Sequence, residues 1–106
     1  MNETLPKPVN QFCKRYPEIW KTFNQLGELC HEAGPLDEKT RRLVKLALSI
    51  GAGLEGATHS AVRNARSTGV SADEIHHVAL LAITTLGLPS ATRAMTWIDD
   101  LEKKGR

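Results

Sequence analysis

Apolar residues recur at three- and four-residue intervals along most of the chain, and this spacing predicts helices. One helix is expected to begin near Pro17 and to end before Gly34-Pro35, since glycine commonly follows a helix and proline cannot continue one. Its apolar face consists of Ile19, Trp20, Phe23, Leu26, Gly27 and Cys30. A shorter helical segment from Asn10 should end before Tyr16, because a residue that precedes proline avoids the helical region.

The middle of the chain continues the helical pattern. Asp37 can cap a helix over LDEKTRRLVKLALSIGAG, and the second half of this helix is apolar on most sides, as expected of a central helix. Gly51 and Gly53 allow a break before the next helix. That helix carries His59 and should extend to about Thr68.

The last third of the chain begins with a capping box at residues 71–74, SADE, in which the serine and Glu74 satisfy each other's backbone amides. The helix that follows is apolar nearly all round between Val78 and Leu86, so it should be buried or lie in a subunit interface. Pro89 can open a final helix with an alanine-rich face. Because alternation with period two is absent, we predict an all-α helical bundle of about five to six helices.

The length of 106 residues allows one domain, expected over residues 10–106, and residues 1–9 with their two prolines should form a mobile amino-terminal arm. A net charge of +2 does not indicate a nucleic-acid partner. There is no targeting signal, and the longest apolar run, residues 78–83, is too short to cross a membrane. We therefore expect a cytoplasmic protein without membrane or nucleic-acid partners.

Cys13 and Cys30 are the only cysteines, and their wide separation matches no metal or redox motif, so we expect free thiols. His76 and His77 are adjacent and point to different faces of a helix. The chain also lacks paired histidines at metal-binding spacing. We therefore expect neither a metal nor a cofactor.

The strongest candidate for chemistry is a stripe on the helix that carries His59. Glu55, His59 and Arg63 follow one another at four-residue spacing and so share one face. A carboxylate beside an imidazole can fix its tautomer and suits it for acid–base catalysis, while an arginine can bind a substrate carboxylate. The alternative interpretation is a solvated or interface row of charges, which is common on helices.

Three segments together resemble the carboxymuconolactone decarboxylase family, which also contains the alkylhydroperoxidase-D-like proteins. They are LDEKTRRLVKLALSIGAG, GATHSAVRNARSTGVSADEI and LLAITTLGLPSATRAM, in the order and spacing typical of the family. The resemblance covers residues 36–101 and implies an all-helical homo-oligomer, such as a trimer or a hexamer. It also implies one of two chemistries: a thiol peroxidase, or a decarboxylase that acts on a lactone from aromatic-compound catabolism.

The chain departs from the peroxidase branch of this family. The Cys-x-x-Cys pair that precedes the histidine in that branch would fall on Ala52 and Glu55, and neither can attack a peroxide. We therefore expect a decarboxylase or lactone-handling enzyme. In it His59 and Glu55 would be catalytic, and Arg63 would bind a small carboxylated substrate. Two alternatives stay open: an oligomeric subunit or binding module without chemistry, and a weaker one, peroxidase activity through Cys13 or Cys30.

Overall fold

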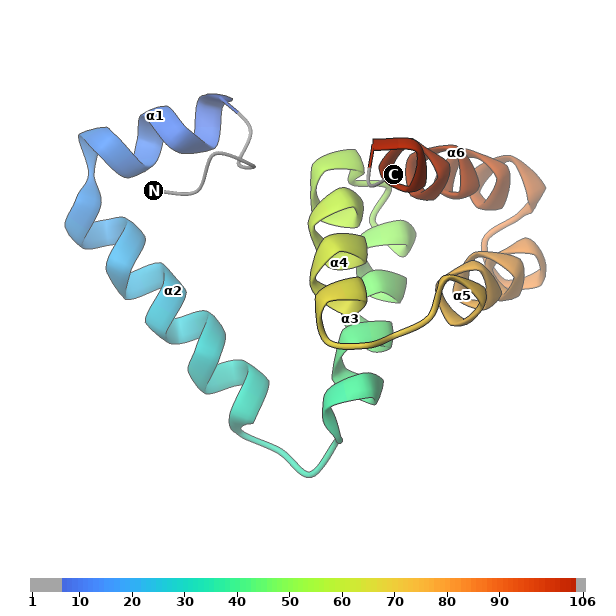
Figure 1. Ribbon diagram of the computed structural model, residues 1–106, viewed down its shortest axis with the longest axis horizontal. Helices are drawn as coiled ribbons and strands as arrows, with labels where there is room; N and C mark the ends of the chain where they lie inside the picture. Colours follow the sequence, from blue (N-terminus) through green and yellow to red (C-terminus); the bar gives the residue numbers. More distant parts are fainter. Residues whose placement is uncertain (1–6, 105–106) are drawn as a thin grey trace. The chain divides into compact units, whose positions relative to one another are not determined.

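A computed structural model describes residues 7–104 and contains six helices (Figure 1). Their bounds are α1 Lys7–Arg15, α2 Pro17–Glu32, α3 Glu38–Gly51, α4 Glu55–Ser67, α5 Ala72–Thr85 and α6 Leu88–Lys104. No strand occurs in the described part of the chain, so the predicted all-α fold is confirmed. Helix α1 begins within the expected mobile arm, at Lys7, and the rest of that arm lies outside the described residues.

The chain divides into two compact units, which we call the amino-terminal unit (residues 1–35) and the core unit (residues 36–106). The first contains α1 and α2, and the second contains α3 to α6. The expected single domain over residues 10–106 stays a prediction.

In the core unit α6 packs against both α4 and α5, and α3 packs against α4 and α5 and also contacts α6. Its buried side chains form one continuous apolar cluster: Leu46, Ile50, Val62, Ala65, Val70, Ile75, Ala79, Ala82, Ala91, Ala94 and Ile98. Five of these are alanines, which let helix backbones approach closely. Because α6 lies against two helices at once, its polar residues can meet side chains from both.

Local capping explains where two helices of the core unit, α3 and α5, begin. The Asp37 carboxylate accepts a hydrogen bond from the Thr40 amide at 2.8 Å, as the sequence predicts for a cap. The capping box is also present. The Ser71 hydroxyl accepts from the Glu74 amide at 3.1 Å, and the Glu74 carboxylate accepts from the Ser71 amide at 2.9 Å.

The amino-terminal unit has little core of its own. Among its described hydrophobic side chains only Cys13 is buried. Phe12, Trp20 and Phe23 form a small aromatic cluster across α1 and α2, with ring centroids 6.4 Å apart for the first pair and 5.7 Å for the second. Within the described residues, no helix has the length and apolar character needed to cross a membrane.

Candidate functional site

The turn between α3 and α4 brings the first turn of α4 beside α6. Gly53 adopts a positive φ of 69°, which side chains other than glycine rarely tolerate. A Cβ atom at Gly53 would also lie 3.2 Å from the Nη2 atom of Arg93 in α6, so a side chain there would displace the guanidinium. The guanidinium in turn lies over the ring of Trp97, 5.2 Å from its centroid. Backbone conformation and packing thus both favour glycine at this position.

His59 lies in α4 with its Nε2 atom 3.7 Å from Oδ2 of Asp100 in α6. The side chain is 19 % exposed, but Nε2 itself is enclosed and makes no hydrogen bond among the described residues. Nδ1 is neither enclosed in this way nor hydrogen-bonded within the described part of the chain. One ring nitrogen therefore faces a carboxylate, and the other has no hydrogen-bond partner among the described residues.

The three residues predicted from the sequence all lie on α4, but the structure does not join them into one ion-paired row. Glu55 is exposed, and its carboxylate forms a close cluster with His59 and Asp100, in which the nearest polar atoms lie within 4.8 Å of one another. The carboxylate at ion-pair distance from His59 is that of Asp100, and Glu55 makes no such pair in the described residues. Arg63 is half-buried and has no ion pair among them.

The fully buried Thr58 precedes His59 in α4, and its hydroxyl has no hydrogen-bond partner in the described structure. A buried hydroxyl without a partner costs about 1–3 kcal/mol of stability. This first half of α4 therefore contains two enclosed polar atoms, the Thr58 hydroxyl and the His59 Nε2, without hydrogen bonds.

Sequence reasoning missed Asp100 and Arg93, which the fold brings to the amino-terminal end of α4. Both residues come from α6, which is far from His59 along the chain. The sequence contains only a weak indication of Asp100. Two consecutive aspartates, Asp99 and Asp100, directly follow an apolar residue, Ile98, which is buried in the structure.

A second histidine is bound to the other aspartate of this pair. His76 in α5 has Nδ1 at 2.8 Å from the carbonyl oxygen of Ala72 and Nε2 at 3.3 Å from Oδ1 of Asp99. Glu102 also approaches, with Oε1 3.6 Å from Nδ1. Burial lowers the pKa of His76, but the hydrogen bonds to Asp99 and Ala72 and the charges of Glu102 and Asp99 outweigh it, so the pKa is raised.

The basic residues near the start of α3 are paired with acidic ones. Nε of Arg42 lies 2.6 Å from Glu38, and Nζ of Lys39 lies 2.7 Å from the Glu74 carboxylate. The hydrogen bond from Lys39, with that from the Ser71 amide, lowers the pKa of Glu74 to about 2. These pairs neutralise much of the positive charge on this helix.

The two cysteines do not form a disulfide: Cys13 is a buried thiol and Cys30 is an exposed one. Both lie in the amino-terminal unit. The two positions of the peroxidase cysteine pair are occupied by Ala52, the C-cap residue of α3, and by Glu55, the first residue of α4. The histidine helix therefore contains no thiol.

Comparison with known proteins assigns this chain to one family and finds relatives of similar sequence and fold. The sequence profile of the carboxymuconolactone decarboxylase family matches residues 17–100. An uncharacterised protein of Methanocaldococcus jannaschii is 25% identical over 89 residues, which cover 83% of this chain and 86% of that protein.

Two crystal structures have a similar fold. A carboxymuconolactone decarboxylase family protein from Legionella pneumophila superimposes with a TM-score of 0.78 and 22% identity, over 93% of this chain and 88% of that one. A protein from Burkholderia xenovorans, named after carboxymuconolactone decarboxylase, superimposes with a TM-score of 0.69 and 22% identity, over 94% and 81% of the two chains. At this identity the likeness establishes the fold.

Proposed function

Since the chain belongs to the carboxymuconolactone decarboxylase family, we propose that it is an acid–base enzyme acting on a small carboxylated lactone, with His59 as the residue that moves the proton. The observation that carries this proposal is the asymmetry of the His59 ring. Its Nε2 atom is enclosed and faces Asp100 at 3.7 Å, and its Nδ1 atom has no hydrogen-bond partner among the described residues. An acid–base histidine needs one nitrogen held and the other within reach of the substrate.

In this proposal Asp100 orients the imidazole by favouring a proton on Nε2, so that Nδ1 exchanges protons with the substrate. The sequence suggested that Glu55 fixes the tautomer of His59. In this proposal Asp100 has part of that role. Glu55 adds a second carboxylate within the same cluster. In this proposal His59 holds a proton and then donates it.

Decarboxylation requires such a donor. When the bond between a carbon atom and its carboxylate breaks, carbon dioxide leaves and the electron pair stays on the remaining carbon skeleton. The imidazolium of His59 would donate its Nδ1 proton to that carbanion, and solvent would restore the proton afterwards. Arg63, one turn further along α4, would bind a substrate carboxylate through its two-pronged guanidinium.

The test is turnover of carboxymuconolactone by the purified chain, followed as loss of substrate and release of carbon dioxide. His59→Ala should lower kcat by about 100- to 10,000-fold, the range that a positioned acid or base supplies. His76→Gln is the matched control, since it removes the other histidine paired with an aspartate and should keep kcat near that of the wild type. Full activity in His59→Ala would disprove the assignment.

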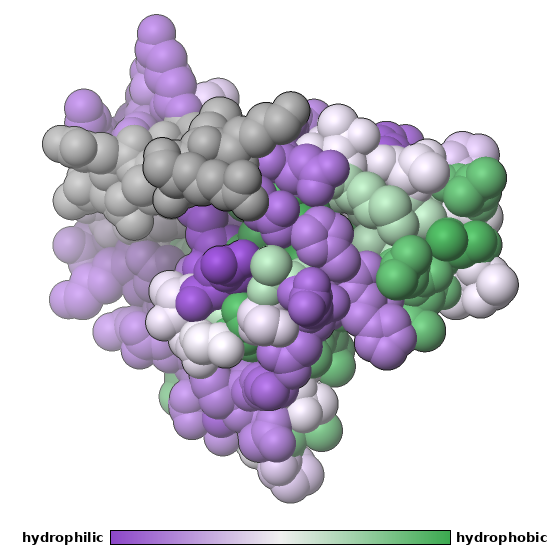
Figure 2. Space-filling model, turned by 45° about the vertical axis from the view of Figure 1, so that its right-hand side comes forward, coloured by the Kyte–Doolittle hydropathy of each residue, from purple (hydrophilic) through white to green (hydrophobic). Residues whose placement is uncertain are grey.

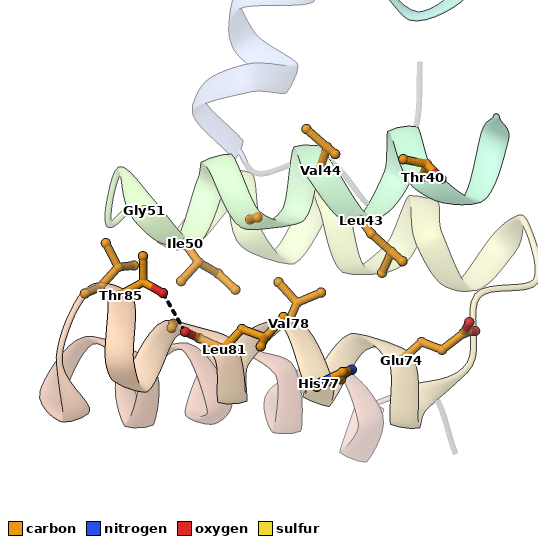
Figure 3. A pocket seen from close by; sticks show the side chains of 13 residues that line it. Thr40, Leu43, Val44, Ile50, Gly51, Glu74, His77, Val78, Leu81 and Thr85 are labelled. Atoms are coloured by element: carbon orange, nitrogen blue, oxygen red, sulfur yellow. Dashed lines mark hydrogen bonds between the residues drawn. The ribbon is translucent and has the colours of Figure 1, made fainter. Parts of the chain in front are cut away.

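A second function has its own supporting observation, namely an apolar groove of about 520 Å³ between α3 and α5, which Leu43, Ile50 and Val78 help to line (Figure 3). In this alternative the chain is an oligomeric binding module that keeps the fold without the chemistry. Turnover distinguishes the two functions. A binding module should turn over no carboxylated lactone, and its His59 and Asp100 variants should keep the wild-type oligomeric state.

A further inference from the structure

Positive charge by itself does not mark a binding site on the core unit. Nε of Arg42 lies 2.6 Å from Glu38, and Nζ of Lys39 lies 2.7 Å from Glu74, so these two cations are already paired. Hydrophilic side chains are also frequent on the face that Figure 2 shows. An arginine that binds a ligand has to be held in place and has to lack a carboxylate partner within the chain.

Arg93 of α6 meets both conditions. Its guanidinium lies over the ring of Trp97, 5.2 Å from the centroid, and Trp97 is itself buried. On another side the guanidinium lies against Gly53, where a Cβ atom would be 3.2 Å from Nη2. Arg93 nevertheless has no ion pair and no hydrogen bond among the described residues. The ring holds one face of the guanidinium, and the N–H groups at its edge are left for an acceptor.

A guanidinium held in this way is suited to a carboxylate. Its planar fork matches the two oxygens of a carboxylate, and the charge on both partners strengthens the hydrogen bonds. An arginine side chain normally loses much rotamer freedom when it binds a ligand. Because Trp97 and Gly53 restrict Arg93 beforehand, less of that freedom is lost on binding.

Two contacts between α4 and α6 relate Arg93 to His59. Gly53, just before α4, meets Arg93, and further along both helices His59 meets Asp100. Arg93, Trp97 and Asp100 recur at four- and three-residue spacing and therefore share one face of α6. At the rise of an α-helix, Arg93 and Asp100 are roughly 10 Å apart along the axis. The guanidinium and the imidazole thus belong to one strip where α4 and α6 meet.

The proposed reaction determines which carboxylate of the substrate Arg93 can bind. The carbon atom that accepts the proton lies close to His59, and so does the carboxylate that leaves from it. Arg93 is remote from His59 and therefore meets a carboxylate that the substrate keeps. Binding energy from a group that does not react can be used to orient the group that does.

We propose that Arg93 is a further substrate-binding residue of this site, in addition to Arg63. Its guanidinium binds the carboxylate that the substrate keeps, and this contact turns the reacting carbon atom toward His59. The inference rests on the proposed function for the identity of the substrate, whereas the binding of a carboxylate at Arg93 does not require any reaction. It also gives Gly53 a role in binding, since a side chain there would displace the guanidinium.

A titration with glutarate, a small dicarboxylate without a lactone ring, tests the binding step. The chain contains two tryptophans, so fluorescence in a Trp20→Phe background reports Trp97 alone. At constant ionic strength glutarate should change this fluorescence until it saturates, and the neutral diamide of glutarate should not. Absence of any such binding in the wild-type background would overturn the proposal.

Variants in the same background assign the binding to Arg93. Arg93→Gln should raise the dissociation constant of glutarate roughly 10- to 100-fold, because a charge-assisted, two-pronged contact is lost. Arg93→Lys keeps the charge without the fork and should have a smaller effect. Arg66→Gln is the matched control, since Arg66 is an exposed arginine of α4 without an ion pair among the described residues, and it should change the constant less than about twofold. Equal constants in Arg93→Gln and the background, or an equal loss in Arg66→Gln, would overturn the proposal.

Steady-state kinetics on carboxymuconolactone separates binding from catalysis. Arg93→Gln should raise KM roughly 10- to 100-fold and change kcat less than about threefold, because the retained carboxylate bears the same charge in the substrate and in the transition state. A loss confined to kcat would contradict the assigned role. Circular dichroism checks that the variant remains helical. If glutarate binding depends on Arg93 while no lactone is turned over, the proposed function fails and the carboxylate site at Arg93 is supported.

Discussion

His59 and His76 make an instructive comparison, because each lies beside one of two consecutive aspartates of α6. Both ring nitrogens of His76 are occupied, Nδ1 by the Ala72 carbonyl and Nε2 by Asp99. His59 has only a longer approach to Asp100, at 3.7 Å, and its other nitrogen has no hydrogen-bond partner among the described residues. The same pair of residue types therefore produces two different sites.

The difference indicates which histidine is free to do chemistry. An acceptor faces each ring nitrogen of His76, and these contacts outweigh the effect of burial, so that the pKa of His76 is raised. A histidine whose two nitrogens are both bound has no atom left for a substrate. His76 therefore serves the contact between α5 and α6, while His59 keeps one nitrogen available.

Among the effects that test this comparison of the two histidine–aspartate pairs, the largest concerns the aspartates themselves. Asp100→Asn should lower kcat by roughly 10- to 100-fold, which is part of the contribution that a positioned acid or base makes. Asp99→Asn is the matched control on the same helix turn and should leave kcat within a factor of about two. Steady-state kinetics on carboxymuconolactone measures both. Equal losses in the two variants would mean that Asp100 acts through the stability of α6 and not through His59.

A smaller effect concerns the pH dependence of stability. The folded pKa of His76 is raised above its ordinary value of 6.5, so its contribution to stability is fully present below that pH and is lost as the pH rises through the folded pKa. The free energy of unfolding should therefore fall as the pH rises above about 6.5, and His76→Gln should flatten this part of the curve. Urea titrations across this pH range measure the slope. An unchanged slope in the variant would assign the pH dependence to other groups.

The smallest effect concerns the residue before His59. Thr58→Val replaces a buried hydroxyl without a partner by a methyl group of similar size, so it should raise the free energy of unfolding by about 1 kcal/mol. Thr84→Val, at an exposed position of α5, is the control and should change it by only a few tenths. Destabilisation by Thr58→Val would show that the hydroxyl has a hydrogen-bond partner in the working protein.

Much of the fold could be predicted from the sequence because its causes are local. Helical spacing of apolar residues, the Asp37 cap and the Ser71–Glu74 capping box act within a few residues of one another. The helix from Pro17 to the residues before Gly34 has the predicted start and nearly the predicted end. The start of α1 was less clear, since Lys7 and Pro8 carry no apolar signal.

The candidate site was predictable only in part. Glu55, His59 and Arg63 could be placed on one helix face because four-residue spacing determines it. Spacing cannot say which side chain on another helix meets that face. Asp100 reaches His59, and Arg93 reaches Gly53, only because α6 packs across α4.

The sequence by itself determined the helical elements, their caps, the family and the absence of cysteines from the histidine helix, since each depends on residue type and short-range spacing. The tertiary structure decided which aspartate accompanies which histidine. It also decided that apolar side chains of α3 and α5 line a groove between these two helices. Both depend on how helices distant in the chain pack together, because the pairing of side chains between helices is a property of their mutual orientation and not of either helix alone.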